Sequence, residues 1–154
     1  MRALTVNQQL LQWLEQSRTN LESAIEGLTE EQMSRPVDEG WSVKDHLTHV
    51  TVWDEMRFFE IGRIARGGEP SMLAKEEAEL AWLNDGFAAE RRRLPISQVL
   101  ADMQFAHEMV KQAVAAAPED RLDENLFGEV TAIGAVHEVD HAETIRNWRK
   151  REGI

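Results

Sequence analysis

The sequence predicts an all-α fold, and specifically a four-helix bundle. Long stretches carry apolar residues at helical spacing, and no segment alternates apolar and polar residues clearly enough to predict a strand. The four prolines and nine glycines fall mostly between those stretches. No repeat or linker divides the chain, so we expect one domain over residues 1–154, with an additional short helix between the second and third core helices.

The first helix is expected from about Asn7 to Leu28. Its apolar stripe is Leu10, Leu14, Leu21, Ile25 and Leu28. Two pairs with capping-box spacing, Thr5 with Gln8 and Thr29 with Gln32, predict the start of this helix and a short helical turn after it. A loop is then expected over residues 35–40.

The second long helix is expected to begin at Ser42, with Asp45 at the reciprocal capping position, and to end at Gly67. A weaker helix is expected over residues 76–93, ahead of Pro95.

Ser97 is predicted to cap the next helix, which runs to about Ala117 and stops at Pro118. The last helix is expected over residues 130–151 and finishes at Gly153.

Composition excludes several kinds of site and partner. The chain contains no cysteine, so a disulfide, a thiolate metal site and a cysteine nucleophile are all excluded. Its formal charge of −11 repels nucleic acid and anionic lipid. The N-terminus lacks an apolar signal core, and no stretch approaches the ~20 apolar residues of a membrane span. We therefore expect a cytoplasmic protein that binds neither nucleic acid nor a membrane.

Two histidines four residues apart, His137 and His141, are the strongest candidates for metal ligands. Both fall within about 60° of the apolar direction of the last helix, so both face the core, where they can converge on one ion. The alternative is a pair of hydrogen-bonded core histidines, although burying two imidazoles without a shared partner is costly. Glu138 and Asp140 lie about 80° to either side and could orient a ligand or act as a base, or pair with solvent or another helix.

The third ligand is less clear from periodicity. On the second helix His46 lies nearer the apolar stripe than His49 does. His107 also lies on an apolar face, where a core histidine is the commoner interpretation. Asp54 is a further candidate for a polar group in the pocket, or else a partner of Arg57 or of a neighbouring helix.

These residues resemble the DinB superfamily of YfiT-like metalloenzymes. In that family a Trp is followed eight residues later by a His, as Trp41 is by His49, and the last helix carries an H-x-x-x-H pair, as at His137 and His141. Trp53 and the segment 145–148 are similar to the branch containing the DfsB and ClbS proteins. The resemblance implies three metal ligands, His49, His137 and His141, and gives no catalytic residue.

Residues 137–141 also fit the H-E-x-x-H motif of zinc proteases, in which the Glu activates water. Those enzymes take a third ligand well downstream, whereas only thirteen residues follow His141 and none is a histidine. The sequence therefore disfavours a protease.

Three neutral imidazoles leave a coordination position for water or substrate. The favoured function is a metal-dependent enzyme acting on a small molecule, a hydrolase or a transferase that uses a low-molecular-weight thiol. The alternatives are a protection protein that binds a metal or metabolite without turnover, and a purely structural metal. Nickel or zinc is favoured, with iron and manganese also suited to imidazole, and the resemblance allows a homodimer. With an imidazole pKa of about 6.5, metal affinity is expected to fall below about pH 6.

Overall fold

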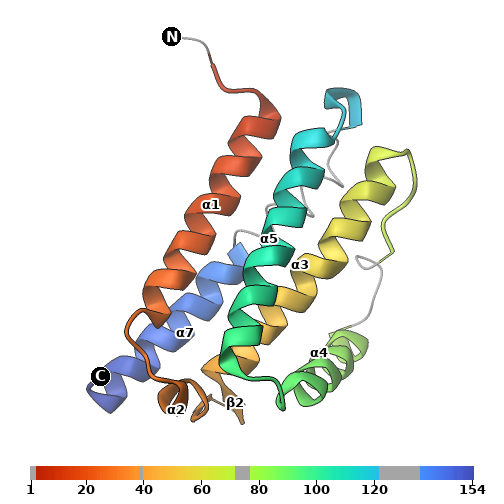
Figure 1. Cartoon of the computed structure of the whole chain (residues 1–154). Coiled ribbons are helices and arrows are strands. Elements are labelled where there is room, and N and C mark those ends of the chain that lie inside the picture. The colour runs from red at the N-terminus through yellow and green to blue at the C-terminus, as the bar shows by residue number, and fades with distance from the viewer. Residues whose placement is uncertain (1–2, 39, 72–76, 122–135) are drawn as a thin grey trace.

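The computed structural model describes residues 3–38, 40–71, 77–121 and 136–154. In this part of the chain four long helices form a bundle (Figure 1): α1 (Val6–Ile25), α3 (Val43–Ala65), α5 (Ile96–Ala116) and α7 (Val136–Glu152). Helix α1 packs against α7 and α5, while α3 packs against α5. The shorter α4 (Glu77–Arg91) lies outside the bundle against α3. The predicted bundle and its additional helix are confirmed.

Three helices begin where the sequence predicts. Complete capping boxes precede α1, the four-residue α2 (Glu30–Met33) and α3, at Thr5 with Gln8, Thr29 with Gln32, and Ser42 with Asp45. The end of α3 is also as expected, since Gly67 takes the positive φ of +85° that favours glycine. The N–H groups of Gly67 and Gly68 donate to the carbonyls of Ile64 and Arg63, as in a Schellman motif.

Two predicted helix ends are wrong. Helix α5 begins at Ile96, and its N-cap is Pro95 rather than Ser97. The Pro95 carbonyl accepts the N–H groups of Gln98 and Val99 and so starts the helix two residues earlier, without a side-chain cap. Helix α1 ends at Ile25 instead of Leu28, because Gly27 takes a φ of +78° and turns the chain.

A small strand pair replaces the expected loop over residues 35–40. Strands β1 (Pro36–Asp38) and β2 (Trp41–Ser42) are antiparallel, with Gly40 at a φ of +94° in the turn between them. Strands this short show no readable alternation, which explains why the sequence did not predict them. The hairpin packs against α7 and leads directly into α3.

The predicted start of the last helix, residues 130–135, lies outside the described residues, and α7 ends at Glu152, one residue beyond the expected end.

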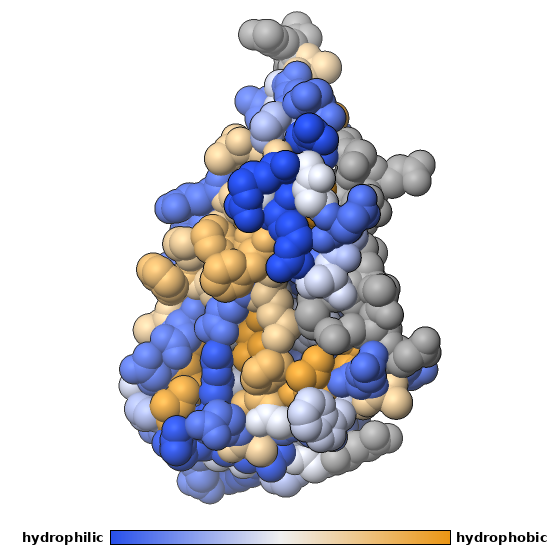
Figure 2. All heavy atoms as spheres, turned by 90° about the vertical axis from the view of Figure 1, so that its right-hand side faces the viewer, coloured by the Kyte–Doolittle hydropathy of each residue, from blue (hydrophilic) through white to orange (hydrophobic). Residues whose placement is uncertain are grey.

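None of the described helices is long and apolar enough to cross a membrane. On the face shown in Figure 2 an apolar area is bordered by strongly hydrophilic residues.

The bundle core consists of two apolar clusters. One includes Leu21, Leu47 and Trp148, and the other includes Leu14, Ile61 and Val110. Along α1, α3 and α5, buried polar side chains separate the residues of one cluster from those of the other, and a further one precedes the cluster residues of α7. These side chains are Arg18, Asp54, Arg57, His107 and Glu138. The candidate functional site consists of three histidines next to this polar layer, His49, His137 and His141.

Candidate metal centre

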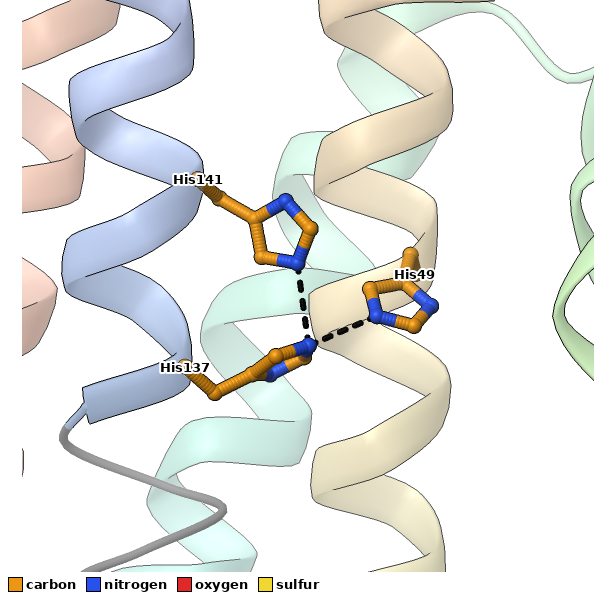
Figure 3. Close-up of side chains that lie close together, drawn as sticks. All are labelled: His49, His137 and His141. Carbon is orange, nitrogen blue, oxygen red and sulfur yellow. Dashed lines mark hydrogen bonds between the residues drawn. The ribbon is translucent and has the colours of Figure 1, made fainter. Parts of the chain in front are cut away.

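Three histidines from two helices bring their ring nitrogens together (Figure 3). His49 comes from α3, and His137 and His141 from consecutive turns of α7. The Nε2 atom of His137 lies 2.6 Å from Nε2 of His49 and 2.9 Å from Nε2 of His141. One ligand nitrogen from each ring lies within 4.8 Å of the other two, so this group could hold a metal ion. The structure thus brings together all three histidines that the resemblance implied as ligands.

The donor set fits a cation. A neutral imidazole nitrogen either carries one proton or offers one lone pair, so Nε2 of His137 cannot form two full hydrogen bonds with His49 and His141. At least one close nitrogen pair therefore lacks a good hydrogen bond, and a cation shared by three lone pairs removes that conflict. Neighbouring nitrogens of a tetrahedral zinc site lie about 3.3 Å apart, which is about 0.7 Å and about 0.4 Å more than the 2.6 Å and 2.9 Å found here.

The electrostatics keep these imidazoles neutral, the form that binds metal. Burial, followed by repulsion from the neighbouring histidines and Arg57, lowers the pKa of His49 to about 3, although a hydrogen bond with Asn84 opposes the shift. Burial and then Arg57 lower the pKa of His137 to about 4. Burial and the adjacent histidines also lower the pKa of His141. At neutral pH all three lone pairs are available to a metal ion.

Two tryptophans form part of the wall around His49. The Trp41 ring lies edge-on to the His49 ring, with 5.1 Å between centroids, and Trp53 lies 6.2 Å away. The Trp53 indole N–H donates to Oδ1 of Asn84, which joins α4 to this wall. A cavity of about 380 Å³ opens beside Trp41 and is lined by Asp38, Trp41, Ala81, Asn84 and Asp85. Three of these five lining residues, Asp38, Asn84 and Asp85, are polar.

His46 lies outside the three-histidine group but contacts one of its members. Its Nδ1 atom is 2.7 Å from Nδ1 of His141, and its Nε2 atom is 3.3 Å from a carboxylate oxygen of Asp38. His46 is 4% exposed and therefore buried. Burial lowers the pKa of His46, against the opposing effect of Asp38. His46 is therefore not among the three histidines whose ring nitrogens converge.

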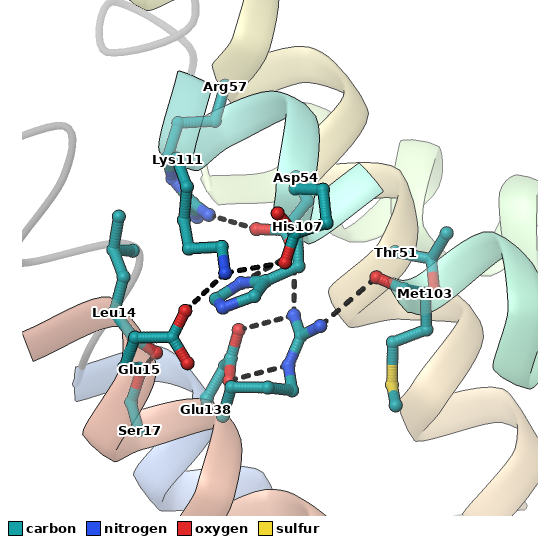
Figure 4. Close-up of polar contacts among 12 residues, drawn as sticks. Leu14, Glu15, Ser17, Thr51, Asp54, Arg57, Met103, His107, Lys111 and Glu138 are labelled. Atoms are coloured by element: carbon teal, nitrogen blue, oxygen red, sulfur yellow. Dashed lines mark hydrogen bonds and ion pairs between the residues drawn. The ribbon is translucent and has the colours of Figure 1, made fainter. Parts of the chain in front are cut away.

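The carboxylates near the triad are held by arginines. Glu138 accepts two hydrogen bonds from Arg18, at 3.1 Å from Nε and 2.8 Å from Nη2. Asp54 accepts from Arg18 at 2.7 Å and from Arg57 at 2.5 Å. Figure 4 shows the carboxylates of Asp54 and Glu138 and the backbone carbonyl oxygen of Met103 directed toward the same buried region. Asp54 thus pairs with Arg57, and Glu138 pairs with another helix, as two of the sequence alternatives stated. Asp140 is exposed.

Sequence reasoning missed Arg18. This residue is 3% exposed, and its Nη1 atom also donates to the Met103 carbonyl at 3.0 Å, so its guanidinium connects α1, α3, α5 and α7. The available signal was its position, since Arg18 lies four residues after Leu14 and three before Leu21, on the apolar stripe of α1.

His107 belongs to this buried layer rather than to the triad. It is 4% exposed, and its Nδ1 atom lies 3.9 Å from Asp54. Neither ring nitrogen has a hydrogen-bond partner within the described part of the chain. Burial, then repulsion from Arg18, lowers its pKa to about 3. Asp54, His107 and Glu138 form a second group with metal-ligand spacing, but Arg18 and Arg57 already pair with its two carboxylates.

Comparison with known proteins agrees with this arrangement. The sequence model of the DinB superfamily matches residues 14–145. The chain belongs to the DinB superfamily. A crystal structure of an uncharacterised protein from Escherichia coli UTI89 has the same fold, with a TM-score of 0.81 and 16% sequence identity over 96% of this chain and 95% of that one. No curated protein sequence matches the chain.

Proposed function

We propose that this DinB-superfamily protein binds one divalent metal ion on His49, His137 and His141 and is a metal-dependent enzyme acting on a small molecule. The proposal depends on the convergence of the three Nε2 atoms from α3 and α7. Nickel and zinc are the first candidates, since imidazole suits both, and iron and manganese are the next.

Hydrolysis and group transfer with a low-molecular-weight thiol are the reactions we favour. A divalent ion held by the three imidazoles would supply Lewis-acid chemistry to a water or thiol substrate. The protein supplies neutral imidazoles, the Trp41 and Trp53 walls and the cavity beside Trp41. The formal charge of −11 favours a small-molecule substrate over nucleic acid.

The arrangement argues against a zinc-protease mechanism. In the H-E-x-x-H motif the Glu is the general base, whereas Glu138 is 1% exposed and its two carboxylate oxygens both accept hydrogen bonds from Arg18. A carboxylate held in this way is not placed to take a proton from a water in the triad.

A protein that binds a metal or metabolite without turnover is the second candidate. One observation favours it: Arg18 and Arg57 hold Asp54 and Glu138, two buried carboxylates on the helices that carry the ligands. No catalytic base is therefore assigned among the described residues.

Metal analysis tests the site itself. Metal-free protein is equilibrated separately with Zn²⁺, Ni²⁺, Mn²⁺ and Fe²⁺, and bound metal is counted after removal of free ion. We expect one equivalent for the wild type and for the control variant His107→Ala, which alters a buried histidine outside the triad. A wild-type protein that retains none of these ions would refute the proposal.

Turnover separates the two functions. The loaded protein is assayed for hydrolysis of activated esters and amides, and for addition of a small thiol to a chromogenic electrophile. Enzymatic activity should be lost in His137→Ala and restored by metal only in the wild type. Stoichiometric metal together with saturable ligand binding, but no turnover in any assay, would favour the binding protein instead.

A further inference from the structure

The two ring nitrogens of His141 have different neighbours. Its Nε2 atom faces Nε2 of His137 at 2.9 Å, inside the triad, and its Nδ1 atom faces Nδ1 of His46 at 2.7 Å, outside it. His46 in turn presents its Nε2 atom to Asp38 at 3.3 Å. These contacts form a continuous path from the triad through His141 and His46 to a carboxylate that is 40% exposed in its side chain.

The proton positions along this path are linked. If Nε2 of His141 offers its lone pair to a metal ion, the neutral ring carries its proton on Nδ1. That N–H can donate only if Nδ1 of His46 accepts, and His46 then carries its own proton on Nε2. The Nε2 atom of His46 lies 3.3 Å from a carboxylate oxygen of Asp38, within reach of electrostatic attraction, although it forms no hydrogen bond within the described part of the chain. One assignment of tautomers therefore gives the His141 N–H an acceptor and puts the remaining proton of His46 beside the Asp38 carboxylate.

We propose that His46 is a positioning residue for the metal centre, which holds His141 in the tautomer and orientation that present Nε2 to the ion, with Asp38 fixing His46. The inference rests on the proposed metal-binding function. Metal-bound histidines generally donate their other ring N–H to a protein acceptor, and loss of that acceptor weakens metal binding. His46 has the required place, since it is buried and its Nδ1 atom lies 2.7 Å from Nδ1 of His141.

The local fold explains how this contact is fixed. His46 lies in the first turns of α3, directly after the β1–β2 hairpin, and Asp38 ends β1. The hairpin packs against α7, so it holds Asp38 on the same side as His141. The Trp41 ring lies edge-on to His46, at 5.3 Å between centroids, and limits rotation of the imidazole. The short strand pair thus positions Asp38 and Trp41, the two residues that support His46.

The first test compares Zn²⁺ affinity, measured by competition with a chromophoric chelator. His46→Ala should weaken binding by about 10–100-fold. His46→Gln should recover most of that loss, because its amide oxygen can accept the His141 N–H, whereas His107→Ala should stay close to the wild type. Affinity in His46→Ala within about twofold of the wild type would refute the proposal.

The second test reads the tautomers directly and needs no variant to fold. Two-dimensional ¹⁵N–¹H spectra of the histidine rings should show His141 protonated on Nδ1 and His46 on Nε2, in the metal-free and Zn²⁺-loaded protein. The opposite assignment, with the shared proton on His46 Nδ1, would overturn the inference. If the wild type binds no metal the proposed function fails, yet the metal-free spectra still decide whether His46 accepts from His141.

Discussion

Replacing Arg18 by Met should destabilise the metal-free protein far more than the loss of a surface ion pair would. Arg57 stays on Asp54 at 2.5 Å, but Glu138 loses both N–H groups that it accepts from Arg18. Glu138 is 1% exposed, so water cannot replace them without opening the bundle. Removing one partner of a buried ion pair costs about 3–5 kcal/mol.

The charge of Glu138 sets an independent limit on this cost. A glutamate with an ordinary unfolded-state pKa of about 4.3 can be kept neutral at pH 7 for about 3.7 kcal/mol, and the lost hydrogen bond to the Met103 carbonyl adds about 1 kcal/mol. Burial already raises the pKa of Glu138, and removal of the Arg18 charge raises that pKa further. A raised carboxyl pKa favours the folded state at low pH, so the cost should shrink by about 1.4 kcal/mol between pH 7 and pH 6.

Urea unfolding followed by tryptophan fluorescence at both pH values measures the effect. The double variant Arg18→Met/Glu138→Gln should recover much of the stability at pH 7 and lose the extra pH dependence. Arg35→Met is the matched control, because its pair with Glu31 is exposed and should contribute less than about 1 kcal/mol. A loss below about 1 kcal/mol for Arg18→Met, or a loss that does not vary with pH, would show that the Arg18 network does not hold the bundle as described.

Three further predictions concern the histidines. His137→Ala or His141→Ala should abolish stoichiometric metal binding. The circular dichroism spectrum should stay helical, since neither imidazole belongs to the two apolar clusters. A variant that retains stoichiometric metal would show that its histidine is not a ligand. His49→Ala should weaken metal binding more than His46→Ala, and chelator competition giving the reverse order would exchange their roles. The third prediction concerns unfolding in acid. A histidine whose pKa is lowered in the folded state makes its full contribution to the free energy of unfolding above the unfolded-state pKa of about 6.5. That contribution decreases as the pH falls, by up to about 2 kcal/mol per ring at pH 5. With the pKa of His49 and His107 near 3 and that of His137 near 4, metal-free protein should unfold in acid at a higher pH than zinc-loaded protein, and coincident acid transitions in circular dichroism would contradict this.

The lowered pKa values also correct the expectation that metal affinity falls below about pH 6. That expectation used the pKa of a free imidazole, whereas burial keeps His49 and His137 neutral in the folded protein well below pH 6. Direct proton competition in the folded state is therefore displaced to lower pH, and metal loss near pH 5 should instead follow unfolding. Burial is a tertiary property, which is why the sequence could not supply this correction.

Local features of the fold were determined by the sequence itself. The capping boxes at Thr5, Thr29 and Ser42 depend on contacts within four residues, so their spacing was sufficient to place three helix starts. Helix α5 shows the limit of this reasoning, because Pro95 and Ser97 both offer a local start and the carbonyl of Pro95 forms the first hydrogen bonds.

The candidate site likewise depends partly on spacing along one helix and partly on the packing of different helices. Helical geometry puts His137 and His141 on one face whatever surrounds them, so that half of the triad followed from the sequence. The meeting of His49 with this pair, and the contact of His46 with the far side of His141, depend on how α3 is rotated against α7. Arg18 is the extreme case, since three other helices supply its partners. Spacing along one helix fixes which side chains share a face, but only the packing of helices decides which faces meet.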